Sequence, residues 1–224
     1  MGIPATNTNQ AQMNVSPATA LGMQDIYTIS ETKQLPLGTF VRLADGRGFV
    51  YGKAGATALA AGKLTQSAAP TQEDQAVTVT AAVGAMQLSV TTDSETTTLN
   101  QYAGGFVYVN DDTGESQMYT IRGNAAATTT GPVILYLYEK VRTAITAGSG
   151  TVSIVKHPCD GLIVSPTTLT ASVCGVPNVA VTAAYYAWFQ VLGVCPVLTD
   201  GTIVVGEWVR SEERRVGKEC RSRW

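Results

Sequence analysis

The sequence has few charged residues and few residues that favour helices. Asp, Glu, Lys and Arg make up 14% of its 224 residues, against roughly 25% in an average soluble domain. Glycine, alanine, threonine and valine take their place, and no long stretch repeats apolar residues at the helical period. This composition is typical of a β-protein whose surfaces pack against neighbours. With 45% apolar residues, the chain can bury a core, either as one β-rich domain or as two small ones.

Much of the charge that is present lies at the C-terminal end. Residues 210–224, RSEERRVGKECRSRW, carry six basic and three acidic residues. This segment resembles the translation of a short-read sequencing adapter, so we interpret it as a non-native tail on a chain that continued past Val209. Without the tail, the chain has 15 − 6 = 9 basic and 17 − 3 = 14 acidic residues. Such a chain lacks the clustered Lys and Arg that bind phosphates, so we expect no direct nucleic-acid partner.

Signals for export and for membrane insertion are also missing. The first twenty residues contain no basic start followed by an apolar run. No apolar run approaches the length of a membrane span, so we expect no membrane partner. Outside the tail there are three cysteines, Cys159, Cys174 and Cys195, and their wide spacing forms neither a CxxC motif nor a metal-ligand pair. Buried, reduced thiols are the default interpretation, and one disulfide with one thiol left over stays open.

The sequence offers little for catalysis. Its single histidine, His157, precedes Pro158 and Cys159. A Cys-His nucleophile pair needs the imidazole within hydrogen-bond reach of the thiol, and the intervening proline favours a turn instead. Zinc would need Cys174 and Cys195 as further ligands, which nothing in the spacing supports. No G-x-S-x-G motif carries a nucleophilic serine. We therefore expect no enzyme, no catalytic or metal-binding residues and no cofactor.

Short apolar stretches, punctuated by Gly, Asp and Pro, predict an all-β fold, a barrel or sandwich of short antiparallel strands. Asp45-Gly46 predicts a hairpin, whereas residues 54–67 permit a short helical turn and residues 171–177 are interpreted as a loop. The acidic residues 110–115 indicate a solvated turn rather than a Ca²⁺ site, because they lack the spacing of an EF-hand loop. The expected strands are residues 37–43, 49–51, 76–82, 86–92, 106–109, 117–121, 132–140, 151–155, 184–192, 194–198 and 202–205.

Composition also divides the chain. Residues 1–24 are polar and aperiodic, which predicts a flexible N-terminal arm. Residues 25–209 form the β domain, in which the threonine-rich residues 76–155 are a candidate inserted lobe. Residues 210–224 are the adapter-like tail.

One predicted strand, residues 132–140, is apolar on both sides. Ile134, Tyr136 and Tyr138 point to one face, while Val133, Leu135 and Leu137 point to the other. Two apolar faces predict a strand covered on both sides, either within the core or against another subunit.

The bulkiest apolar stretch, residues 179–208, also presents aromatic side chains to two faces. On a strand, Tyr185 and Phe189 point one way, and Tyr186 and Trp188 point the other. An exposed platform for stacking sugars would place its aromatic rings on one side. Bulk on two sides favours a core or an interface, so these four residues are our core or interface candidates.

Three stretches resemble a family of tailed-bacteriophage virion structural proteins. They are DGRGFVYGKAGATALAAGKL at 45–64, NQYAGGFVYVNDDTGE at 100–115 and GLIVSPTTLTASVCGVPNVAVTAAYYAWFQVLGVCPVLTDGTIVVGE at 161–207. The last stretch is the most specific, with its PTTLT, YYxWxQ and TDGT elements. Family members continue into further β-structure after the TDGT element, where this chain has the adapter-like tail.

The resemblance implies a head decoration protein that stabilises the capsid by non-covalent contacts. It implies the major capsid protein and copies of the chain itself as partners, in a homo-oligomer for which a trimer is one expected state. The expected location is the capsid surface of the virion, and the host cytoplasm during assembly. The alternative is a carbohydrate-binding adhesin module associated with the tail or fibre, which would need exposed aromatic side chains.

Overall fold

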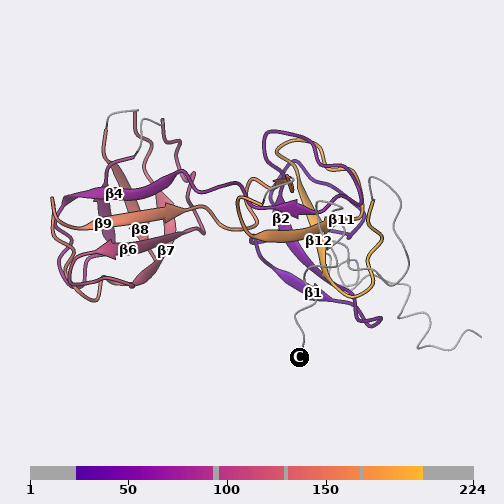
Figure 1. Ribbon diagram of the computed structural model, residues 1–224, viewed down its shortest axis with the longest axis horizontal. Coiled ribbons are helices and arrows are strands. Elements are labelled where there is room, and N and C mark those ends of the chain that lie inside the picture. The colour runs from indigo at the N-terminus through magenta and orange to yellow at the C-terminus, as the bar shows by residue number, and fades with distance from the viewer. Residues whose placement is uncertain (1–23, 93–95, 129–130, 167–168, 199–224) are drawn as a thin grey trace, which may run out of the picture. The chain divides into compact units, whose positions relative to one another are not determined.

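The structure, a computed structural model, describes residues 24–92, 96–128, 131–166 and 169–198. These residues form strands and no helices, and the named strands pair antiparallel, so the predicted all-β class is confirmed (Figure 1). Within these ranges there is accordingly no helix long and apolar enough to span a bilayer. Nearly all of the predicted arm, the expected strand at 202–205 and the adapter-like tail lie outside the described residues.

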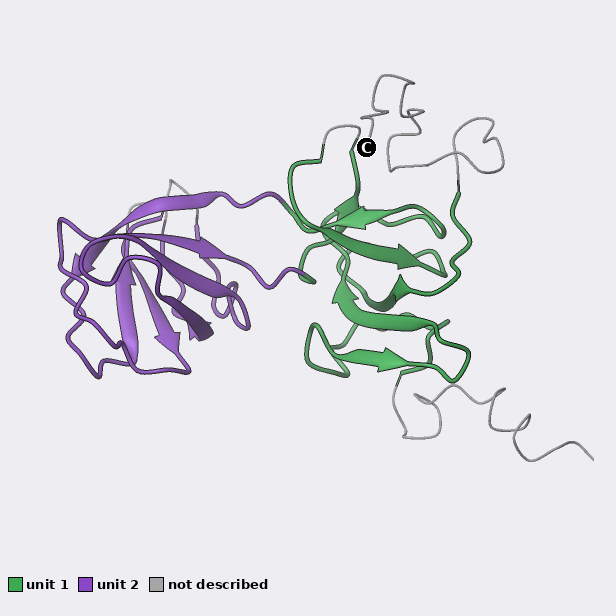
Figure 2. Ribbon diagram, turned by 60° about the horizontal axis from the view of Figure 1, so that its bottom comes forward, with its two compact units in different colours: residues 1–68, 159–224 green, residues 69–158 purple. Residues whose placement is uncertain are grey.

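The chain divides into two compact units (Figure 2). One unit is continuous and comprises residues 69–158. The other is built from the chain on either side of it, residues 1–68 and 159–224. The candidate lobe at residues 76–155 therefore lies inside the continuous unit, whose boundaries are seven residues earlier and three residues later.

The continuous unit is a closed barrel in which every strand has two neighbours, in the order β4-β5-β8-β7-β6-β9. The alternation of side chains along each strand fits a closed barrel, because every second residue points into the barrel interior. In β8, for example, Val133, Leu135 and Leu137 are fully buried. Inward residues from all six strands form one apolar core. The barrel strands are β4 (Gln72–Val79), β5 (Gln87–Val90), β6 (Phe106–Asp111), β7 (Met118–Asn124), β8 (Val133–Leu137) and β9 (Thr151–Val155).

The outer face of β8 departs from the sequence prediction. Ile134 is 36% exposed and Tyr138, just after the strand, is 60% exposed. The prediction of a strand buried within the core on both sides is wrong, because a barrel strand has one face inside the barrel and one face outside. Cover by another subunit stays a prediction.

The other unit contains an open six-stranded sheet in the order β1-β2-β12-β11-β3-β10. The hairpin predicted at Asp45-Gly46 is confirmed, because β1 pairs with β2 and Gly46 has a φ of 90°, a conformation that glycine adopts without steric cost. The strands are β1 (Phe40–Arg42), β2 (Gly48–Lys53), β3 (Thr65–Gln66), β10 (Ile163–Val164), β11 (Val173–Pro177) and β12 (Tyr186–Leu192).

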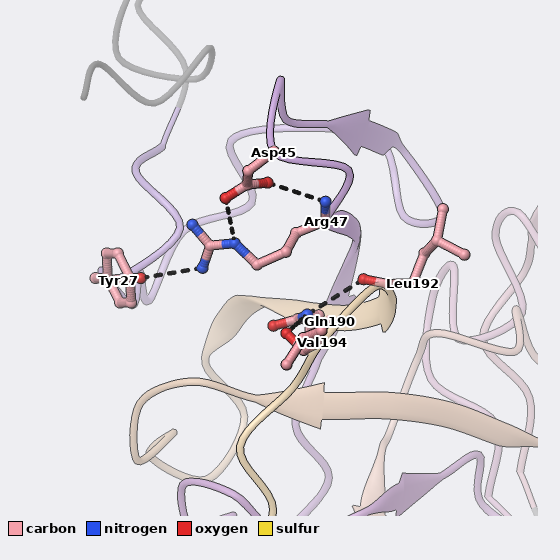
Figure 3. Close-up of polar contacts among 6 residues, drawn as sticks. All are labelled: Tyr27, Asp45, Arg47, Gln190, Leu192 and Val194. Carbon is pink, nitrogen blue, oxygen red and sulfur yellow. Dashed lines mark hydrogen bonds and ion pairs between the residues drawn. The ribbon is translucent and has the colours of Figure 1, made fainter. Parts of the chain in front are cut away.

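Three local predictions in this unit are wrong. Residues 171–177 contain β11 rather than a loop alone, and residues 54–67 contain β3 and turns rather than helix. Residues 194–198 form no strand. The buried Gln190 side chain donates hydrogen bonds to the carbonyl oxygens of Leu192 (3.2 Å) and Val194 (2.8 Å), which bends the chain where β12 ends (Figure 3).

Candidate functional site

The four aromatic residues singled out from the sequence lie at β12, which pairs with β2 on one side and β11 on the other. Trp188 and Phe189 are fully buried, and they belong to two different apolar clusters. Tyr186 packs against the Trp188 cluster and Tyr185 against the Phe189 cluster, and both tyrosines are partly exposed. The two-sided arrangement expected from alternation is therefore present within one unit, where it builds core on both faces of the sheet.

Around Trp188 the polar atoms are satisfied as well as buried. Its indole Nε1 donates to the carbonyl oxygen of Gln24 at 2.8 Å, and the hydroxyl of Tyr51 donates to Gln24 Oε1 at 2.8 Å. The Tyr51 ring meets Trp188 edge-on at 5.2 Å and stacks on Tyr186 at 6.0 Å. Burial raises the pKa of Tyr51. Gln24 thus anchors the end of the predicted arm to the core, and a shielded Trp188 cannot stack on a sugar.

The residues considered for Cys-His chemistry each have a different side chain beside them. The His157 ring stacks on Phe106 with centroids 6.5 Å apart. The Cys159 Sγ atom lies 3.8 Å from the Sγ atom of Cys174. Among the described residues there is no group of three His, Cys, Asp or Glu side chains placed to hold a metal ion. The spacing of the cysteines gave no signal of the Cys159–Cys174 contact, because it depends on where β11 lies in the sheet.

The acidic turn at residues 110–115 is more structured than the sequence indicated. The carboxylate of Asp112 accepts hydrogen bonds from the backbone N–H groups of Thr146 and Thr113, which lower its pKa. Asn110 Nδ2 donates to Asp74 Oδ1 and, at 2.7 Å, to Ser153 Oγ. These hydrogen bonds connect the turn to neighbouring segments of the barrel, and both carboxylate oxygens of Asp112 have partners within the protein.

A second polar cluster fixes the β1–β2 hairpin of the open-sheet unit (Figure 3). Arg47 Nε lies 2.7 Å from Asp45 Oδ2, and the Arg47 backbone N–H donates to Asp45 Oδ1 at 3.0 Å. Hydrogen bonds from Arg47 lower the pKa of Asp45, and hydrogen bonds with Tyr27 and Asp45 raise the pKa of Arg47. The guanidinium also lies 5.7 Å from the centroid of the Phe49 ring. The cluster orders a turn at the surface, a role that the sequence predicted only through Gly46.

The barrel carries an exposed apolar surface on the outer sides of β6, β7 and β8. We call it the outer wall. Tyr108 on β6 lies directly opposite Met118 on β7, and these side chains are 37% and 52% exposed. Phe106, two residues before Tyr108, is partly exposed and its ring lies 6.5 Å from that of Tyr108. The outer wall is defined by the residues Phe106, Tyr108, Met118, Ile134, Tyr136 and Tyr138.

Two charged side chains, Arg122 and Glu139, make contacts at the outer wall. On β7 the Arg122 guanidinium lies 6.0 Å from the centroid of the Tyr136 ring, where it covers aromatic surface. Between Met118 and Arg122, Thr120 donates its backbone N–H to the Glu139 carboxylate at 2.8 Å. The sequence signal for this surface was the apolar alternation of residues 132–140. The contributions of Tyr108 and Met118 could not be found from that signal, because they depend on the strand order of the barrel.

Comparison of the chain with protein-family models, with curated proteins and with solved structures finds no match in any of the three.

Proposed function

We propose that this protein is a structural component of a phage virion, a head decoration protein that stabilises the capsid by non-covalent contacts. Its partners are the major capsid protein and further copies of the same chain, in a homo-oligomer for which a trimer is the first state to test. It assembles in the host cytoplasm and remains on the capsid surface of the virion. The motifs at residues 45–64, 100–115 and 161–207, which resemble those of phage virion proteins, support this proposal.

The structural observation that carries the proposal is the apolar outer wall. The barrel core is complete on the inner side, where Val133, Leu135 and Leu137 are fully buried. The barrel itself therefore does not need Tyr108, Met118 or Tyr138 to be apolar. Contiguous exposed apolar surface marks interaction sites, and tyrosine and methionine are enriched in interfaces. A protein that acts by adhering to a lattice needs such a surface.

On a capsid lattice, individually weak contacts would be enough to keep the protein bound. Each copy of an oligomer docks on an equivalent position of the lattice, so one contact raises the effective concentration for the next. Overall avidity then exceeds the affinity of a single contact by about 10²–10⁴-fold. A small apolar surface on each copy can in this way hold the whole assembly.

The first experiment is mass spectrometry of purified virions of the phage that encodes this chain. We expect its peptides at a constant molar ratio to the major capsid protein, in heads separated from tails. Absence from the particles would contradict the proposal. Recovery with tails, together with binding to host glycans, would replace it with the adhesin alternative.

The second experiment tests the outer wall. Purified protein is added to capsids that lack it, and binding is measured by co-sedimentation. Met118→Ser and Tyr138→Ser should each weaken binding about tenfold, the equivalent of about 1.4 kcal/mol for a side chain buried on docking.

Leu99→Ser is the matched control, because Leu99 is an exposed apolar residue of the same unit outside the outer wall. It should bind like the unmodified protein. Equal binding by all four proteins would show that the outer wall is not the docking surface, and circular dichroism would verify that each variant is folded.

A further inference from the structure

Two cysteines that are distant in the sequence have neighbouring side chains in the open-sheet unit. The Cys159 and Cys174 sulfur atoms lie 3.8 Å apart, as thiols. A disulfide needs a sulfur–sulfur bond of about 2.0 Å, so the two atoms would have to approach by less than about 2 Å. The third cysteine of the described chain, Cys195, hydrogen-bonds through its thiol to the Pro196 carbonyl oxygen at 3.6 Å.

The backbone holds both cysteines in place. The carbonyl oxygen of Cys159 accepts a hydrogen bond of 2.8 Å from the backbone N–H of Lys53 in β2. Cys174 lies in β11 at an irregularity, because Val173 and Gly175 pair with the adjacent residues Gln66 and Thr65 of β3. The extra residue in such a bulge has its side chain turned out of the regular alternation. The bulge therefore orients Cys174 independently of the strand's alternation.

We propose that Cys159 and Cys174 form an intramolecular disulfide when the folded protein meets a peroxide. This cross-link goes beyond the proposed function and does not depend on it. It would join the chain that follows the barrel to β11, and it would close a loop that contains β10. The sequence left open which two of the cysteines could pair, and the structure assigns them.

The chemistry follows from the burial of the two thiols. Cys174 is partly exposed whereas Cys159 is buried, so peroxide reaches Cys174 first. The Cys174 thiolate attacks one oxygen of hydrogen peroxide, the O–O bond breaks, and Cys174 sulfenic acid and hydroxide form. The Cys159 thiolate, its proton taken up by that hydroxide as water, then attacks the Cys174 sulfur. The S–O bond breaks, and hydroxide leaves and takes up the proton that the Cys174 thiol released when it ionised. In total, two thiols and one peroxide give one disulfide and two water molecules.

Reaction of Cys174 is expected to be slow. Its hydrogen bond with the Cys159 thiol and its burial raise its pKa, so little thiolate is present at neutral pH. Oxidation therefore calls for incubation over hours rather than seconds. This slow rate separates it from the rapid oxidation of redox-sensor cysteines, which have a low pKa.

The test uses the 224-residue chain with Cys195→Ser and Cys220→Ser, so that no other thiol is present. After treatment with hydrogen peroxide the intact mass should fall by two hydrogens, about 2 Da, as one disulfide forms. Chymotrypsin cuts after leucine and separates the two cysteines at Leu162 and Leu169. The resulting peptides should remain joined until a reductant is added.

Thermal unfolding gives a second readout. A disulfide that closes a loop of about fifteen residues should raise Tm by roughly 5–10 °C. In Cys174→Ser, made in the same background, peroxide should produce neither the joined peptides nor the rise in Tm. Circular dichroism would verify that this variant is folded.

Two results would overturn the proposal. One is full alkylation of both thiols, under denaturing conditions, after prolonged oxidation of the folded protein. The other is a disulfide between different chains, seen as a dimer on a non-reducing gel.

Discussion

At Gly175 a missing side chain determines how closely two strands approach. The residue has a φ of 155°, and a Cβ atom there would lie 2.7 Å from the backbone carbonyl oxygen of Gln190 in β12. That oxygen belongs to a central strand and cannot move without disturbing the pairing of β12 with β2. Gly175 thus lets β11 lie against β12, and it immediately follows the bulge that orients Cys174.

We predict that Gly175→Ala lowers the free energy of unfolding by about 2 kcal/mol or more, because it combines backbone strain with overpacking. The measurement is urea denaturation followed by tryptophan fluorescence. Gly46→Ala is the control, since Gly46 lies in the same unit and also has a positive φ but has no atom within 4 Å of its added Cβ. The Gly46 variant should lose only about 1 kcal/mol from strain. Equal losses in the two variants would show that the close approach at Gly175 is unimportant.

Some individual placements follow from the sequence and others do not. The opposite orientation of Trp188 and Phe189 follows from the strand period alone. So does the inward orientation of alternate β8 side chains. The contact of Cys159 with Cys174 has no such signal, because it arises from a bulge. The contact of Gln24 with Trp188 likewise joins residues far apart in the sequence, and no local sequence pattern predicts such a contact.

Among the strands, those with a clear turn and clear alternation were predicted, as β1–β2, β4–β5 and β6–β7 illustrate. β11 was missed because Gly175 and the bulge interrupt its alternation within five residues. Residues 194–198 have a strand-like composition but form no strand. The backbone N–H of Leu198 donates to the carbonyl oxygen of Gly62, but that hydrogen bond alone does not make a strand. Pairing partners decide such cases, and a partner is a property of the fold rather than of the segment.

The two faces of β8 allow a direct comparison. Leu135 is fully buried in the barrel core, and its neighbour Ile134 is on the outer wall. We predict that Leu135→Ala lowers the free energy of unfolding by about 2–5 kcal/mol through loss of buried surface and formation of a cavity. Ile134→Ala should cost less than about 1 kcal/mol, because its side chain stays partly in water. Denaturation of the monomeric protein measures both, and a large loss for Ile134→Ala would mean that the outer wall serves the barrel's own stability.

The whole chain contains one unit that is continuous in sequence and has its own core. We predict that residues 69–158 fold when expressed alone, because all six barrel strands and their core lie within this segment. The segment contains five tyrosines and no tryptophan. Folding would be recognised by a near-ultraviolet circular dichroism signal from these tyrosines that disappears in a single cooperative thermal transition. A featureless spectrum at low temperature would show that the barrel depends on the rest of the chain.

The barrel begins and ends on neighbouring strands, since Gln72 at the start of β4 pairs with Ile154 near the end of β9. Its two ends therefore leave side by side, and a short turn could replace the whole barrel without stretching the remaining chain. In the amino-acid sequence, the barrel is one continuous segment. Recombination at its two boundaries could remove, duplicate or exchange the barrel in a single event. The outer wall, which is the docking surface in our proposal, could thus change while the open sheet keeps its sequence.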